Sequence, residues 1–146
     1  MRIRQQLEKI MDNKITPQAV DENKPAPIIF VVDDWPALLE LTGTLLDSAG
    51  YQTRVFSDPL AVLATLNSAD PKPQLLITDF HMPHLNGMEL IQRCKAIQPD
   101  LKVISTSGST VQNELAAYPE KPDKLLSKPY SGAELLRAVE ALLEEV

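Results

Sequence analysis

Side chains that could do chemistry occupy four places in the sequence, each directly after a short apolar run. In chain order they are the acidic pair Asp33-Asp34, the acid Asp79, the hydroxyl of Ser107 and the ammonium of Lys128. Carboxylates that lie close together repel one another unless a cation is present, and Mg²⁺ is the ion that best fits such a cluster. A carboxylate beside Mg²⁺, with an ammonium and a hydroxyl nearby, is suited to accept a phosphoryl group as a nucleophile.

Each of these residues also has a simpler explanation when it is taken alone. An aspartate between a strand and a helix is most often a helix cap, or favours the positive end of the helix. A Ser-Gly pair is usually a turn, and a Lys-Pro pair is usually a solvated lysine before a loop. The chemical interpretation therefore depends on whether the fold brings all of these groups to one place.

The elements that must position these groups are alternating strands and helices between Pro27 and Val146. The predicted strands are Ile28–Val32, Tyr51–Phe56 (an edge strand), Leu75–Thr78, Val103–Thr106 and Lys124–Ser127. Five strand–helix units predict an α/β fold with a five-stranded parallel sheet and helices on both faces. Function in such sheets collects beyond the carboxyl ends of the strands, which is where the four groups stand.

The helices between the strands are predicted from apolar residues at helical spacing. The predicted buried faces are Leu38, Leu41, Leu45 and Ala49; Leu60, Leu63 and Leu66; Leu90, Ile91, Cys94 and Ile97; and Leu135, Val139, Leu142 and Val146. Asp58-Pro59 is expected to cap the second of these helices, and a Ser131–Glu134 capping box to start the last. A weak additional helix is expected at Thr110–Tyr118, broken by the prolines that follow it. Cys94 is expected to be a buried small hydrophobe, and the His81/His84 pair a loop rather than a metal site.

The first 26 residues differ from the rest and are predicted to be an amphipathic helix and a linker. Ile3, Leu7, Ile10 and Met11 form an apolar stripe, and two prolines at positions 25 and 27 follow a polar stretch. A helix this short is marginal alone in water, so we expect it to form only when docked on its own domain, a second copy or a partner. The predicted domains are thus 1–26 and 27–146.

Composition excludes several classes of function. The net charge is −6 in 146 residues, which disfavours unassisted binding to nucleic acid or to an anionic membrane. The single cysteine cannot form an internal disulfide, and no apolar run approaches the roughly 18 residues that span a bilayer. No signal peptide is apparent, so the sequence predicts a soluble, cytoplasmic protein.

Over about Pro27 to Val146, the chain resembles the receiver domain of two-component response regulators. The matching strings are Phe30-Val31-Val32-Asp33-Asp34, Thr78-Asp79-Phe80-His81-Met82-Pro83-His84-Leu85-Asn86-Gly87, Ser107-Gly108 and Ser127-Lys128-Pro129. The resemblance implies a flavodoxin-like sheet of strand order 2-1-3-4-5 and a cis peptide at Lys128-Pro129. The sequence departs from the family at Leu125, where the family has an aromatic residue three positions before the lysine.

The resemblance also implies a role for each site residue. Asp79 would be the phosphoacceptor, Ser107 would contact the phosphoryl group, and Lys128 would pair with it. Mg²⁺ would be bound by Asp33, Asp34, Asp79 and the backbone carbonyl of His81. The phosphoryl group would come from a histidine kinase or a histidine phosphotransfer domain, and the signal would pass to an unidentified downstream protein, without nucleic acid or membrane as partner.

Other functions were weighed against this phosphoacceptor role. A receiver cut from a hybrid histidine kinase and a phosphorylation-independent adaptor stay open, although Met1 and its amphipathic helix favour a free-standing chain. A phosphatase of the haloacid dehalogenase type is disfavoured because His81 stands where that chemistry needs a second aspartate. A transcription factor is disfavoured because no residues follow Val146. The expected protein is therefore not an enzyme, beyond its own phosphotransfer and dephosphorylation.

Overall fold

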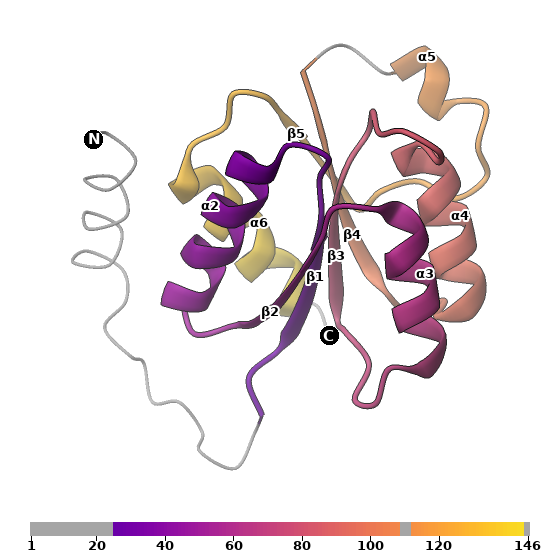
Figure 1. Ribbon diagram of the computed structural model, residues 1–146. Coiled ribbons are helices and arrows are strands. Elements are labelled where there is room, and N and C mark those ends of the chain that lie inside the picture. The colour runs from indigo at the N-terminus through magenta and orange to yellow at the C-terminus, as the bar shows by residue number, and fades with distance from the viewer. Residues whose placement is uncertain (1–24, 109–111, 145–146) are drawn as a thin grey trace.

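The computed structural model describes residues 25–108 and 112–144, which form a single parallel sheet covered by helices on both faces (Figure 1). The strands are β1 (Ile28–Val32), β2 (Gln52–Phe56), β3 (Leu75–Asp79), β4 (Lys102–Ser107) and β5 (Lys124–Ser127). Their order in the sheet is β2-β1-β3-β4-β5, and every neighbouring pair is parallel. The predicted fold class and strand order are confirmed.

The helices form one layer on each face of the sheet. They are α2 (Pro36–Ser48), α3 (Pro59–Ser68), α4 (Gly87–Ile97), α5 (Gln112–Leu115) and α6 (Gly132–Glu144). Figure 1 shows α2 and α6 on one side of the sheet and α3 and α4 on the other. This arrangement follows from right-handed crossovers between parallel strands: the chain moves across the sheet in one direction from β1 to β2 and in the other from β2 to β3 and β4, so α2 lies on one face and α3 and α4 on the other.

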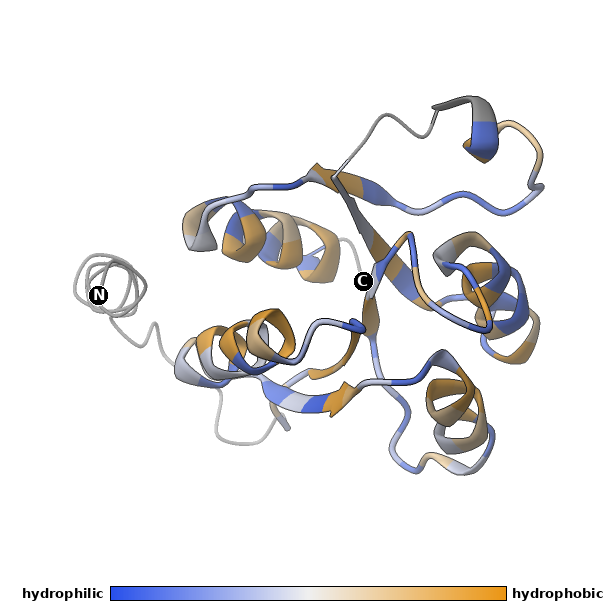
Figure 2. Ribbon diagram, turned by 45° about the horizontal axis from the view of Figure 1, so that its top comes forward, coloured by the Kyte–Doolittle hydropathy of each residue, from blue (hydrophilic) through white to orange (hydrophobic). Residues whose placement is uncertain are grey.

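Two apolar clusters hold these layers together, one on each face. The inner strands β1 and β3 contribute to both clusters, as a strand covered on two sides must. Figure 2 shows hydrophobic colour along the strands and, mixed with hydrophilic colour, on the helices of both layers. Cys94 is fully buried in the cluster under α3 and α4, as predicted, and burial raises the pKa of its thiol to about 12.

The predicted faces of two helices need correction. In α2 the sequence analysis placed Leu38, Leu41 and Ala49 in the core, but these are only partly buried, and the buried residues are Leu39, Thr42, Gly43, Leu45 and Leu46. In α3 the predicted Leu60 is 47% exposed and Val62 is buried in its place. α3 is apolar on every side, and the leucines of α2 cover an arc wider than its buried face, so spacing alone cannot tell which residues meet the sheet.

The helix ends were predicted in part. Asp58 accepts a hydrogen bond from the Leu60 amide (3.0 Å), and Ser131 accepts one from the Glu134 amide (3.1 Å), so both expected caps are present. A capping box at Asn86 and Glu89 starts α4, which the sequence analysis did not anticipate. The helix expected at Thr110–Tyr118 is observed only as Gln112–Leu115, and Thr110 lies outside the described residues.

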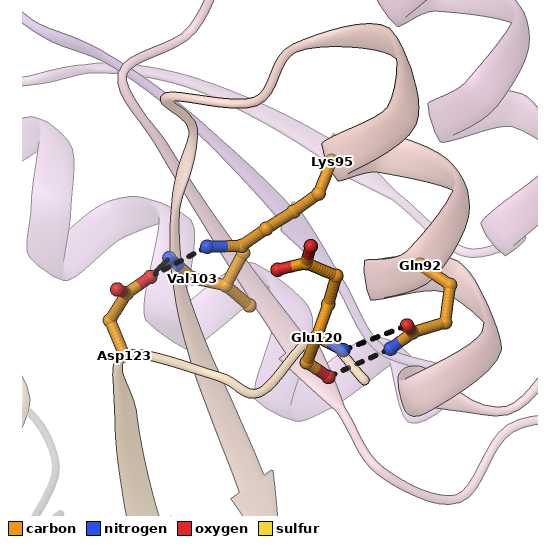
Figure 3. Close-up of polar contacts among 5 residues, drawn as sticks. All are labelled: Gln92, Lys95, Val103, Glu120 and Asp123. Carbon is orange, nitrogen blue, oxygen red and sulfur yellow. Dashed lines mark hydrogen bonds and ion pairs between the residues drawn. The ribbon is translucent and has the colours of Figure 1, made fainter. Parts of the chain in front are cut away.

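The loop between α5 and β5 is fastened to α4 and β4 by polar contacts (Figure 3). The side-chain amide of Gln92 donates to the Glu120 carbonyl (2.8 Å) and accepts from the Glu120 amide (3.0 Å). The Asp123 carboxylate accepts from the Val103 amide (2.8 Å) and pairs with Lys95 (3.4 Å). The residues leading into β5, and hence to Lys128, are therefore fixed to the helix layer.

Two further predictions concern the N-terminal segment and the absence of membrane-spanning helices. The N-terminal helix and the 1–26 boundary fall largely on residues 1–24, which lie outside the described residues, so they stay predictions. Among the described helices, none has the length and apolar character needed to cross a membrane.

Candidate functional site

The three predicted acids meet at the carboxyl edge of the sheet. Asp33 and Asp34 directly follow β1, and Asp79 is the last residue of the neighbouring strand β3. One carboxylate oxygen from each of the three lies within 4.8 Å of the others. Asp33 and Asp79 are buried, whereas Asp34 is exposed, so the cluster opens to solvent on the side of Asp34.

Lys128 lies against this cluster. Its ammonium nitrogen is 3.3 Å from Oδ1 of Asp79 and 3.6 Å from Oδ2 of Asp33. The Lys128 backbone amide donates to the carbonyl of Ser107 (2.7 Å), so β4 and β5 hold these two residues side by side at the same edge. The structure thus brings together the acids, the hydroxyl residue and the ammonium that the sequence analysis singled out, and the Lys128-Pro129 peptide is cis as the resemblance implied.

The simpler explanation of the acids as helix caps fails. The N-cap residue of α2 is Trp35, and no side chain caps that helix. The N-cap residue of α4 is Asn86, seven positions after Asp79. None of the three acids caps the helix that follows it, so their position at the sheet edge calls for another reason.

The electrostatics of the site favour a bound cation. Burial raises the pKa of Asp33 above its ordinary value; the Trp35 amide, which donates to Asp33, and the Lys128 ammonium oppose this effect, and the neighbouring Asp79 and Asp34 add to it. Lys128 supplies one positive charge against three carboxylates. A hard divalent ion with oxygen ligands supplies the missing charge, so the donor set fits Mg²⁺.

We expect Asp33→Asn to stabilise the metal-free protein at pH 7 by about 1 kcal/mol, because it removes a buried charge that only one ammonium compensates. The pKa of Asp33 is higher in the folded protein than its ordinary value of 3.8, so ionisation of this carboxyl lowers the free energy of unfolding. The loss is absent below pH 3.8 and is complete once the pH has risen past the folded-state pKa. The gain should therefore shrink toward pH 4. Urea unfolding in EDTA at both pH values measures it. A variant that is less stable than the wild type in EDTA at pH 7 would contradict this account.

Gly87 is a site residue whose role the sequence analysis did not explain. A Cβ atom at this position would lie 2.5 Å from the backbone oxygen of Asp79 and 3.0 Å from Cα of Phe80. The Gly87 amide also donates to the Phe80 carbonyl (2.8 Å). Only glycine lets the start of α4 pack this closely on the end of β3, which explains its place in the string that begins at Asp79.

Tyr130 is a second residue that the sequence analysis missed. Its hydroxyl is hydrogen-bonded to Thr42 in α2, and burial raises the pKa of Tyr130, with the carboxylates of Asp33 and Asp79 adding to the effect. Tyr130 therefore joins the loop after Lys128 to the helix after the acidic pair. No motif marked it, because the contact joins residues 88 positions apart.

The two histidines of the β3–α4 loop are both exposed. The His81 ring packs against the Phe80 ring in a tilted arrangement, with ring centroids 4.9 Å apart and an interplanar angle of 45°. His84 has a positive φ of 71°, and among the described residues neither histidine belongs to a potential metal-binding cluster. Both histidines lie in the loop between β3 and α4, and the role expected for the His81 carbonyl stays a prediction.

Comparison with known proteins identifies the family. The model of the response regulator receiver domain matches residues 29–140. The chain is 32% identical over 124 residues to the transcriptional regulatory protein GlrR of Escherichia coli, covering 84% of this chain and 27% of that protein. It is 31% identical over 116 residues to the response regulator MprA of Mycobacterium avium, covering 79% of this chain and 50% of that protein. The chain spans half or less of the length of these curated relatives.

Solved structures give the same result. A response regulator receiver domain protein from Clostridium thermocellum superposes with a TM-score of 0.75 at 26% identity, over 82% of this chain and 95% of that one. The response regulator TrrA from Thermotoga maritima, solved in complex with Mg²⁺-BeF, has a TM-score of 0.71 at 26% identity, over 80% of this chain and 98% of that one. Sequence and fold agree: the chain belongs to the response regulator receiver family of two-component signalling proteins.

Proposed function

We propose that this protein is a phosphoacceptor that takes a phosphoryl group onto Asp79 from the phosphohistidine of a kinase or a phosphotransfer domain. The observation that supports this most directly is the buried Asp79 carboxylate, held 3.3 Å from Lys128 within a cluster of three acids. A carboxylate with a partly exposed ammonium beside it is positioned to attack phosphorus while the developing charge is neutralised.

The transfer needs one bond to form and one to break. An oxygen of Asp79 attacks the phosphorus, and the bond between phosphorus and the donor's histidine nitrogen breaks with its electron pair returning to the imidazole. In this proposal Lys128 pairs with the phosphoryl oxygens, and Ser107 donates its hydroxyl to one of them. Mg²⁺, bound by Asp33, Asp34 and Asp79 and by the His81 carbonyl, would neutralise phosphoryl charge.

After transfer, the new charge at Asp79 competes for the Lys128 ammonium, which also pairs with Asp33 at 3.6 Å. The backbone of Lys128 is hydrogen-bonded to Ser107, so a shift of either residue moves the edge where β4 and β5 end. We infer that this edge passes the signal to a protein partner in the cytoplasm. Water can later hydrolyse the acyl phosphate, which makes the protein a transient switch rather than an enzyme with a separate substrate.

The experiment that tests this function is labelling by a small phosphodonor. Acetyl phosphate in Mg²⁺ should add one phosphoryl group to the protein, observed as a mass increase in the intact chain, and EDTA should abolish it. The labelled protein should lose the group in neutral hydroxylamine, which cleaves an acyl phosphate and leaves a phosphoserine intact. No label in Mg²⁺, with the fold verified by circular dichroism, would favour the phosphorylation-independent adaptor.

A further inference from the structure

The helix layer formed by α2 and α6 is strongly acidic, and the layer on the other face of the sheet is not. The charged residues of α2 and α6 are Glu40, Asp47, Glu134, Glu140 and Glu144 against Arg137, all of them exposed. The charged residues of α3 and α4 are Glu89 against Arg93 and Lys95. We call the exposed surface of α2 and α6 the acidic face; it carries a net charge of about −4, whereas α3 and α4 together carry about +1.

The described chain begins next to the acidic face. Gln52 donates from its backbone amide to the Pro27 carbonyl (2.9 Å) and from its side chain to the Ala26 carbonyl (3.0 Å). The preceding residue, Tyr51, is close enough to Glu140 and Glu144 for their charges to raise its pKa, in addition to burial. The described chain therefore begins beside the carboxyl-terminal half of α6.

The first 14 residues have the opposite charge and an apolar stripe. They include four basic residues and two acidic ones, and the stripe is the predicted set Ile3, Leu7, Ile10 and Met11. On a helix with 3.6 residues per turn, Arg4 borders this stripe and Lys14 continues it, whereas Asp12 lies on the opposite side. The surface that such a helix offers is apolar and cationic together.

The acidic face offers a matching surface within reach. Tyr51, Leu136 and Leu143 are only partly buried against the core under α2 and α6, so apolar surface remains between the carboxylates. The ten residues 15–24 span at most about 35 Å, and helices of thirteen residues are about 20 Å long. A tether of this length keeps the segment at a millimolar effective concentration at the face.

We propose that residues 1–14 dock as an amphipathic helix on the acidic face of their own domain. The apolar stripe packs against the partly buried residues between α2 and α6, and Arg4 and Lys14 pair with the glutamates of α6. Since α2 begins two residues after Asp34, the docked segment lies along the helix that leads to the acidic site. The proposal does not depend on phosphotransfer and would hold for an adaptor as well.

The test uses the full chain with a nitroxide label at Gln5→Cys, opposite the apolar stripe. Cys94 is buried and has a pKa of about 12, so it should not compete for the label. Amides of α2 and α6 should be broadened severalfold more than amides of α3 and α4. The effect should be independent of protein concentration, and it should weaken when salt is raised from 0.1 M to 1 M, because the Debye length falls from about 10 Å to about 3 Å.

Charge reversal identifies the contact. Arg4→Glu with Lys14→Glu should reduce the broadening severalfold, and so should Glu140→Lys with Glu144→Lys; the four substitutions together should restore it. Asp100→Lys, an exposed position in the loop before β4, is the matched control and should change little.

Other outcomes would overturn the proposal. Equal broadening on both helix layers, or none, excludes docking on the acidic face. Broadening that appears only when labelled chains are mixed with isotope-enriched ones shows that a second copy is the occupant. Co-sedimentation with phosphatidylserine vesicles without intramolecular broadening shows that the segment binds membranes instead.

Discussion

Asp79→Asn should reduce labelling by acetyl phosphate in Mg²⁺ to background while the protein stays folded. The substitution keeps the shape of the side chain but replaces the carboxylate with an amide, whose oxygen is a much weaker nucleophile. Asp79 is the only one of the three acids whose carboxylate lies within 3.3 Å of the Lys128 ammonium, so no neighbour in the described chain is equally placed to take over. Intact mass spectrometry measures the label.

The control for this variant is an acid of the same type away from the site. Asp47→Asn changes the net charge by the same amount on the exposed side of α2 and should label like the wild type. The stability of Asp79→Asn should differ from that of the wild type by no more than about 1 kcal/mol, since Lys128 keeps its contact with Asp33. A variant that is folded and labels at half the wild-type level or more would show that the acceptor is another residue.

Gly87→Ala should destabilise the protein by about 2–3 kcal/mol, a large effect for one added methyl group. The new Cβ atom would stand 2.5 Å from the backbone oxygen of Asp79, well inside van der Waals contact. The obstacle is the main chain of a central strand, which cannot turn aside as a flexible side chain could. Either α4 shifts away from the sheet or the end of β3 moves, and the second response displaces the proposed phosphoacceptor.

Gly108→Ala is the matched control, because in the described chain no residue other than its immediate neighbours has an atom within 4 Å of a Cβ atom at that position, and the residue is outside the left-handed region. It should change stability by less than about 0.5 kcal/mol. Urea unfolding of both variants gives the comparison, and labelling of Gly87→Ala below its midpoint shows whether Asp79 has been displaced. Equal stability of the two alanine variants would mean that the contact at Gly87 relaxes without cost.

The sequence by itself determined the order and type of nearly every element. Short β-branched runs alternating with helical patterns left few alternatives to a parallel sheet, because parallel strands need crossovers and crossovers of this length are helices. It also determined which side chains meet, since residues after the strands of a parallel sheet must gather at one edge. The convergence of Asp33, Asp79, Ser107 and Lys128 follows from this rule.

The sequence was less informative where several apolar faces compete. In α3 apolar residues lie on every side of the helix, and in α2 the leucines cover an arc wider than the buried face, so only packing against the sheet selected Val62 over Leu60 and Leu39 over Leu38. Leu125, the departure from the family, is 39% exposed on β5, an exposure that its own apolar strand sequence did not indicate. Periodicity gives the direction of burial only when polar residues mark the other side.

Tertiary structure alone decided the contacts between distant parts of the chain. The close approach of Gly87 to Asp79, the hydrogen bond between Tyr130 and Thr42, and the polar contacts of Gln92 and Asp123 join residues brought together by packing. The raised pKa of Asp33 likewise arises mainly from burial. These properties depend on distances of a few ångströms between elements, which the helix layers set when they pack on the sheet, and no local pattern encodes them.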